Sequence, residues 1–122
     1  MLVLTQQPKM ATLNPHPIRI NVIGTPTIGQ QVEVKVLIGH PMETGYRLGD
    51  GGNERIPKNI IEKVSIRLNQ EVLLQAELGT GIAANPLFSV FVTVLAGGSM
   101  ITVEWEDDRG VKGRAEKLLM SA

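Results

Sequence analysis

The chain has 122 residues, 43% of them hydrophobic and 20% charged, which is the length and make-up of one globular domain. Twelve basic side chains balance twelve acidic ones and only 3% of residues are aromatic, so neither a nucleic acid nor a membrane is expected as a partner. The absence of cysteine excludes thiol nucleophiles and thiolate metal ligands.

Residues 1–16 show neither a helical nor an alternating apolar period, and they contain Pro8 and Asn14-Pro15. They predict a flexible N-terminal tail ahead of a single domain over 17–122. No basic residue precedes the short apolar patch at the start, so a signal peptide is not expected.

From Ile18 onward, apolar residues recur at every second position, which is typical of strands with one buried face. No segment shows a sustained helical period. The chain is therefore expected to be all-β, an antiparallel β-sandwich of the immunoglobulin-like kind with about seven strands. The expected strands are 18–22, 32–38, 63–68, 71–78, 87–95, 101–106 and 111–119.

Two connections interrupt this rhythm, Gly39 to Asn59 and Gly79 to Pro86. Long connections in a compact domain are usually functional or disordered, so we expect a localised function to lie in these loops. In the first loop Glu43 and Arg55 carry opposite charge and could pair. We expect this loop to direct His40 and Met42 toward a partner.

The candidates for chemistry are weak. His40 and Glu43 are three residues apart, but a zinc site needs at least three protein ligands and the other histidine, His16, lies in the expected tail. The segment Gly49 to Glu54 lacks the lysine of a phosphate-binding loop and the oxygen spacing of a calcium loop. We therefore predict no catalytic residue, no metal and no cofactor.

A cluster of two glutamates and two aspartates lies between residues 104 and 108, and one interpretation of such a cluster is paired acid chemistry. Glu104 and Glu106 alternate with apolar neighbours, and Asp107 and Asp108 begin a turn. A solvated strand face followed by a turn is the favoured interpretation.

Some apolar residues fall on the outward side of the alternation: Leu37, Leu73, and either Leu87 or Phe91. Single exposed apolar residues are common, but several gathered on one sheet would form a partner surface. The sequence leaves open whether they share a sheet.

Three stretches together resemble the SoxZ family: Ile38-Gly39-His40-Pro41-Met42-Glu43-Thr44-Gly45, then Arg55-Ile56-Pro57, then Ala83-Ala84-Asn85-Pro86. The order continues with Trp105-Glu106-Asp107-Asp108-Arg109-Gly110, so the resemblance covers about Pro17 to Ala122. The first run is the most specific of the four.

The resemblance implies a non-catalytic subunit of the SoxYZ carrier of bacterial thiosulfate oxidation. It implies that SoxY is the partner, that the C-terminal cysteine of SoxY carries the sulfur substrate, and that other Sox enzymes visit the complex transiently. It also implies a periplasmic location, reached by export together with SoxY. The expected partner-binding residues are His40, Met42, Glu43, Arg55, Leu73 and Asn85.

Two other interpretations remain. Strand number and alternation alone would equally fit a generic immunoglobulin-like structural or adhesion module, which only the loop motifs disfavour. A small enzyme comes third, because each candidate pair or cluster considered above is better explained by a structural role.

Overall fold

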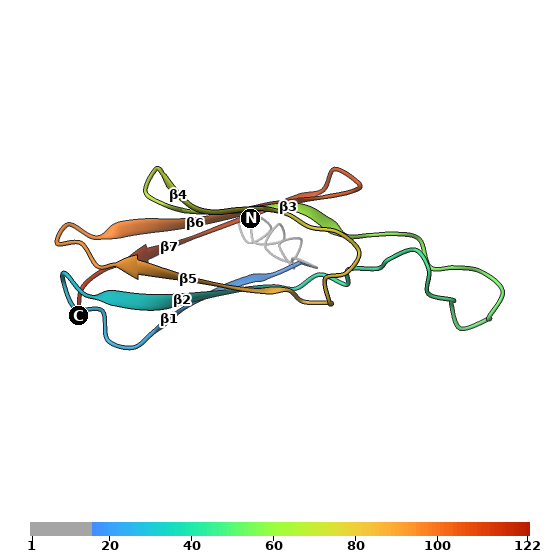
Figure 1. The fold of residues 1–122 in the computed structure, drawn as a ribbon, viewed down its shortest axis with the longest axis horizontal. Helices are drawn as coiled ribbons and strands as arrows, with labels where there is room; N and C mark the ends of the chain where they lie inside the picture. Colours follow the sequence, from blue (N-terminus) through green and yellow to red (C-terminus); the bar gives the residue numbers. More distant parts are fainter. Residues whose placement is uncertain (1–15) are drawn as a thin grey trace, which may run out of the picture.

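The computed structural model describes residues 16–122, and in this part of the chain it contains seven strands and no helix (Figure 1). The predicted all-β antiparallel sandwich is confirmed. No helix in these residues is long and apolar enough to span a membrane. Apart from His16, the expected tail lies outside the described residues. The strands are β1 (Ile18–Ile23), β2 (Gln31–Ile38), β3 (Ile61–Leu68), β4 (Glu71–Glu77), β5 (Leu87–Thr93), β6 (Ser99–Asp107) and β7 (Lys112–Leu119).

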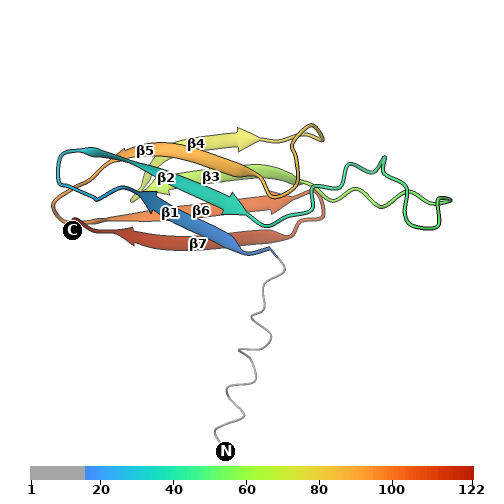
Figure 2. The ribbon, with the colours of Figure 1, turned by 90° about the horizontal axis from the view of Figure 1, so that it is seen from below.

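The strands form two stacked sheets, seen as two layers in Figure 1. One sheet has the order β1-β2-β5 and the other the order β4-β3-β6-β7, and every neighbouring pair is antiparallel. β1 lies against β7, which closes one side of the sandwich. The edge strands β5 and β4 therefore lie together on the opposite side (Figure 2).

The core lies between the sheets and is formed by the inward members of the alternation. β2 shows the pattern most clearly, because Val34, Val36 and Ile38 are fully buried while the residues between them are half-exposed. Burial of an aliphatic side chain contributes roughly 1.5–3 kcal/mol, so this interface between the sheets stabilises the fold. The buried apolar residues are Ile20, Val32, Val34, Val36, Ile38, Met42, Ile60, Ile61, Val64, Ile66, Leu68, Val90, Val92, Val94, Ile101, Val103, Trp105 and Leu119.

A bulge in the β3–β4 pair changes the faces of β4. The pairing shifts register between Ile66 and Arg67, so that Arg67 faces Val72 while Ile66 faces Leu74. Leu73 is the extra residue, and it is half-buried and packs against the core. The expectation that Leu73 lies on an outer face is therefore wrong, because an uninterrupted period of two does not survive a bulge. Val72 takes the exposed position instead.

A narrow arm, residues 43–59, projects from one end of the sandwich (Figures 1 and 2). Isolated bridges pair Glu43 with Asn59 and Leu48 with Arg55. Main-chain hydrogen bonds join the two limbs further, for example from Ile56 N to Arg47 O at 2.7 Å. What the sequence showed as a structureless loop is a ribbon of two antiparallel limbs, held by its backbone.

Candidate functional site

The two long loops and the acidic turn meet at one end of the sandwich, where the arm begins. The Asn85 main-chain N–H donates to His40 O at 2.8 Å, and the His40 N–H donates to Asn85 Oδ1 at 3.1 Å. Asn85 has φ of 53°, a left-handed conformation that asparagine tolerates better than most residues. Segments far apart in the sequence are thereby joined at His40.

The imidazole of His40 is buried, with 1% of the residue exposed. Its Nδ1 accepts a hydrogen bond from the Met42 N–H at 3.1 Å, so the proton of the neutral ring is on Nε2. Nε2 faces Asp107 Oδ2 at 3.6 Å, which is too long for a hydrogen bond. The ring stacks on His16 at 4.7 Å between centroids and meets Trp105 edge-on at 5.5 Å.

The environment of His40 favours the neutral ring. Burial lowers the pKa of His40 below its ordinary value of 6.5, the nearby His16 lowers this pKa further, and the carboxylate of Asp107 opposes the shift. Within residues 16–122, no three histidine or carboxylate side chains are grouped so that they could hold a metal ion. His40 thus helps to hold the loop end together, because its buried Nδ1 accepts a hydrogen bond from the Met42 main chain.

The expectation that His40 and Met42 project toward a partner is wrong. Met42 is 4% exposed and belongs to the core, and its Sδ accepts a hydrogen bond from the Ile61 N–H at 3.3 Å. Its φ of 50° turns the chain inward just before the arm begins. The His-Pro-Met segment therefore anchors the arm to the sandwich.

The predicted pair between Glu43 and Arg55 is also wrong. Glu43 binds Arg47 instead, through contacts of 3.1 and 2.5 Å, and the hydrogen bond from Arg47 lowers the pKa of Glu43. Arg55 Nη1 donates to Tyr46 O at 2.5 Å. The bridges of the arm explain this difference. Arg55 lies opposite Leu48, whereas Glu43 lies opposite Asn59 at the base of the arm.

The arm exposes apolar side chains that the sequence analysis did not single out. Tyr46 is 72% exposed and Leu48 is 51% exposed. The first limb of the arm thus presents an aromatic and an aliphatic group to solvent. Its backbone is held by hydrogen bonds to the second limb. A period-two count along Tyr46 to Leu48 would have found them had the segment been treated as strand-like.

The acidic turn fastens the base of the arm. Asp107 is buried, and its Oδ1 accepts from the N–H groups of Arg109 and Val111 at 2.9 and 2.8 Å. Asp108 Oδ1 accepts from the Ile60 N–H at 2.7 Å. The turn expected here is present, but its two aspartates bind the chain's own backbone and are not simply solvated.

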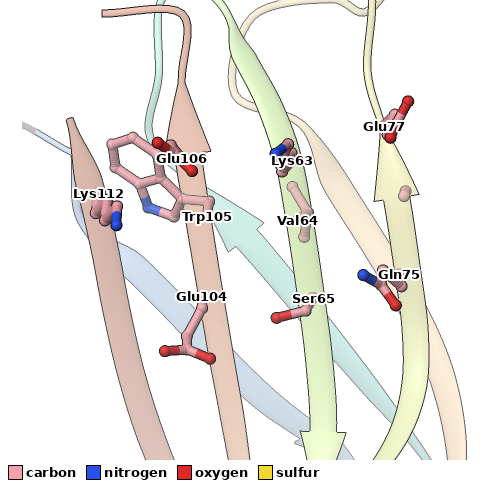
Figure 3. A pocket seen from close by; sticks show the side chains of 10 residues that line it. Lys63, Val64, Ser65, Gln75, Glu77, Glu104, Trp105, Glu106 and Lys112 are labelled. Carbon is pink, nitrogen blue, oxygen red and sulfur yellow. The ribbon is translucent and has the colours of Figure 1, made fainter. Parts of the chain in front are cut away.

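The outer faces of the two sheets differ in chemistry. On the four-stranded sheet, Glu77, Lys63, Glu106 and Lys112 follow one another across neighbouring strands, with alternating sign. They line a shallow depression of about 570 Å³ (Figure 3). Further along this sheet, Glu104 binds Arg67 and Arg114. This face is well suited to water.

The three-stranded sheet has the more apolar outer face. Leu37 pairs directly with Leu87, and Phe91 lies on the same face four pairs away in the β2–β5 register. Leu87 is 58% exposed and Phe91 is 63% exposed. Of the outward apolar residues expected from the sequence, these share one sheet, whereas Leu73 is on the other sheet and packs inward.

Comparison with known proteins places the chain in a family. The model of the family "Sulphur oxidation protein SoxZ" matches residues 20–117. The chain belongs to the SoxZ family. This match spans the arm, the Asn85 loop and the acidic turn, so the resemblance inferred from those motifs is confirmed. SoxZ proteins are components of sulfur oxidation, and the chain is one of them. No curated protein sequence matches the chain.

Solved structures share the fold at low sequence identity. A variant of a superoxide reductase (neelaredoxin) from Ignicoccus hospitalis is 12% identical, with a TM-score of 0.62 and coverage of 98% of this chain and 90% of that chain. A variant of the superoxide reductase from Archaeoglobus fulgidus, in its reduced form, is 18% identical, with a TM-score of 0.61 and coverage of 88% and 91%. At such identities the likeness shows the sandwich fold alone.

Proposed function

We propose that this chain is the non-catalytic subunit of the SoxYZ sulfur carrier in thiosulfate oxidation. It binds SoxY and helps present it to the other Sox enzymes, while the C-terminal cysteine of SoxY carries the sulfur substrate. The match of the SoxZ family over residues 20–117 carries this proposal.

The chemistry of the chain supports this division of labour. Covalent transport of sulfur requires a thiolate, and the sequence contains no cysteine. The histidine at the loop end, His40, is buried and uses Nδ1 to hold the Met42 N–H, so it is not placed to act on a substrate. A subunit built in this way acts through the surfaces it presents.

Several of the residues expected to bind the partner have positions that suit contact. Asn85 and Arg55 are exposed at the loop end. Tyr46, which was not among the expected residues, is exposed on the arm. Glu43 is partly exposed and holds Arg47 beside it. His40 and Met42 support this region from beneath. We assign the loop end to contacts with SoxY or with the enzymes that process its cargo.

We further propose that the protein works in the periplasm, where it arrives bound to SoxY. A subunit that accompanies its partner would depend on a lasting interface, and interfaces of that kind usually have apolar centres with polar rims.

Calorimetric titration of purified SoxY with this chain tests the proposed function. A saturable one-to-one complex is expected. A sandwich domain from an unrelated family, titrated in the same way, is the control and should give no binding. Absence of binding by this chain, with SoxY folded and reduced, would refute the assignment.

A further inference from the structure

β5 differs from the other edge strands of residues 16–122 in having no charged residue. β1 carries Arg19, β4 carries Glu71 and Glu77, and β7 carries several charges. Exposed edges in soluble proteins are usually protected by charge, proline or a bulge, since unprotected edges pair with other chains. β5, with the sequence LFSVFVT, has none of these protections.

The free hydrogen-bonding groups of this edge follow from its pairing with β2. The Ile38 N–H donates to Pro86 O, and the Val94 N–H donates to Gln30 O. The main-chain N–H and C=O groups of the even-numbered residues of β5 therefore point toward β2. The main-chain groups of the odd-numbered residues point away from the sheet. These residues are Leu87, Ser89, Phe91 and Thr93, all exposed. An extended segment of another chain could form hydrogen bonds with this row of N–H and C=O groups.

Apolar groups flank this row on both faces. Leu87 and Phe91 are exposed on the outer face. Toward the inside, Phe88 on β5 and Leu73 and Leu74 on β4 are only half-buried against the core. They belong to the side of the sandwich that β1 and β7 do not close. An added strand with apolar side chains on both faces would cover both sets.

We propose that β5 is the edge to which a strand of the SoxY partner adds, extending the three-stranded sheet. This proposal rests on the proposed function and names the surface that performs it. The occupant is an extended, uncharged segment of SoxY with apolar side chains on both faces. A second copy of this chain fits less well, because Val90 and Val92 of its own β5 are buried in its own core and are not available to cover the open side.

Ser89→Pro tests the backbone contact. Its N–H points away from β2, so proline removes a free donor without breaking the ladder of the sheet. Ser89→Ala is the matched control, since both variants lose the hydrogen bond from Ser89 Oγ to Glu33 Oε2. In titrations with SoxY, proline is expected to weaken binding by about ten-fold or more and alanine by less than about two-fold. Equal affinities for the two variants would overturn strand addition.

Phe91→Lys and Ile23→Lys form a second pair. The two positions flank Glu33 in one cross-strand row, Phe91 on β5 and Ile23 on β1, and both are exposed. Lysine at either site lies beside the same carboxylate, so folding should be affected alike. Only Phe91→Lys is expected to weaken SoxY binding, by about ten-fold or more. If Ile23→Lys weakens binding as much, SoxY covers the sheet face and the edge proposal is wrong.

Hydrogen exchange keeps the proposal testable if Ser89→Pro does not fold. In the wild-type complex, the amides of Ser89, Phe91 and Thr93 are expected to exchange about a hundred-fold more slowly than in the free chain. If SoxY binds and these amides remain unprotected, the edge proposal fails while the proposed function stands. If SoxY does not bind at all, the proposed function fails.

Sedimentation of the chain alone tests whether a second copy of this chain occupies the β5 edge. A monomer is expected at concentrations where SoxY already binds. A concentration-dependent dimer that Ser89→Pro abolishes, combined with unchanged affinity of that variant for SoxY, would assign the edge to a second copy and overturn the proposal.

Discussion

Asn85 and His40 hold each other through two hydrogen bonds, one from each main-chain N–H, at 2.8 and 3.1 Å. The contact joins the loop before β5 to the loop after β2. From His40 it continues to Met42 through the ring, and from Met42 to Ile61 through sulfur. The base of the arm is thus tied to both sheets by a short series of hydrogen bonds.

Substitutions at Asn85 should separate the side-chain contact from the backbone conformation. Asn85→Gly keeps a permissive backbone and loses the bond to His40, so a loss of about 1 kcal/mol in the free energy of unfolding is expected. Asn85→Ala adds the penalty of a left-handed φ, about 1 kcal/mol more. Urea denaturation measures both. Equal stabilities of Asn85→Ala and wild type would contradict the role of this contact.

The lowered pKa of His40 predicts a pH dependence of stability. An unfolded histidine titrates near 6.5, whereas the folded His40 titrates lower, so below about 6.5 the unfolded chain binds more protons. The free energy of unfolding should therefore fall as the pH drops from about 6.5 toward the folded pKa of His40. The pKa of Glu43 is also lowered, but from an ordinary value of 4.5, so Glu43 affects the free energy of unfolding only at lower pH than this range.

His40→Asn provides the comparison for that pH profile. Asparagine retains an acceptor near the position of Nδ1 but does not titrate. Although the variant is less stable overall, its free energy of unfolding should change less between about pH 7 and pH 5 than that of the wild type. Parallel urea denaturation series measure the two profiles. Profiles of equal slope would show that His40 does not cause the dependence.

Gly113 is expected to be required beneath Trp105. A Cβ at Gly113 would collide with Nε1 and Cε2 of the Trp105 indole, so the ring would have to move. Gly113→Ala should lower the free energy of unfolding by about 1–3 kcal/mol. Gly97→Ala, where the added Cβ meets nothing within 4 Å, is the control and should stay within about 0.5 kcal/mol. Fluorescence of Trp105, the single tryptophan, reports the displacement directly.

Strand positions were predictable because apolar and polar residues alternate wherever one face of a strand is buried and the other is exposed to solvent. The exceptions have specific physical causes. The bulge beside Arg67 directs Leu73 inward, and a left-handed φ at Met42 buries a residue expected at the surface. In the register of the arm, Glu43 binds Arg47, and Arg55 donates to the carbonyl oxygen of Tyr46. Bulges and left-handed residues leave little trace in the apolar pattern.

The bulge gives a prediction that the sequence pattern alone would reverse. Leu73→Asp should destabilise the chain by more than about 2 kcal/mol, because a carboxylate would replace an apolar group packed on the core. Val72→Asp, at an exposed neighbouring position, should change stability by less than about 0.5 kcal/mol. Thermal denaturation of the two variants tells them apart. A stable Leu73→Asp protein would argue against the bulged register.

The arm is expected to contribute to function without supporting the fold. Tyr46→Ser and Leu48→Ser replace exposed side chains, so the melting temperature should change little. If the arm contacts the Sox enzymes, the double variant should slow the processing of loaded SoxY while its affinity for SoxY is retained. Steady-state turnover with and without the substitutions measures this. Unchanged turnover would limit the arm to a structural connection.

Mass spectrometry of the loaded complex tests whether this chain binds SoxY without itself carrying the sulfur substrate. SoxY and this chain are incubated together with thiosulfate and the remaining Sox components, and both the native complex and the separated chains are weighed. We expect a complex containing one copy of each chain, with the added sulfur-containing mass on SoxY and none on this chain. A substrate-sized adduct on this chain, with SoxY unmodified, would contradict this expectation.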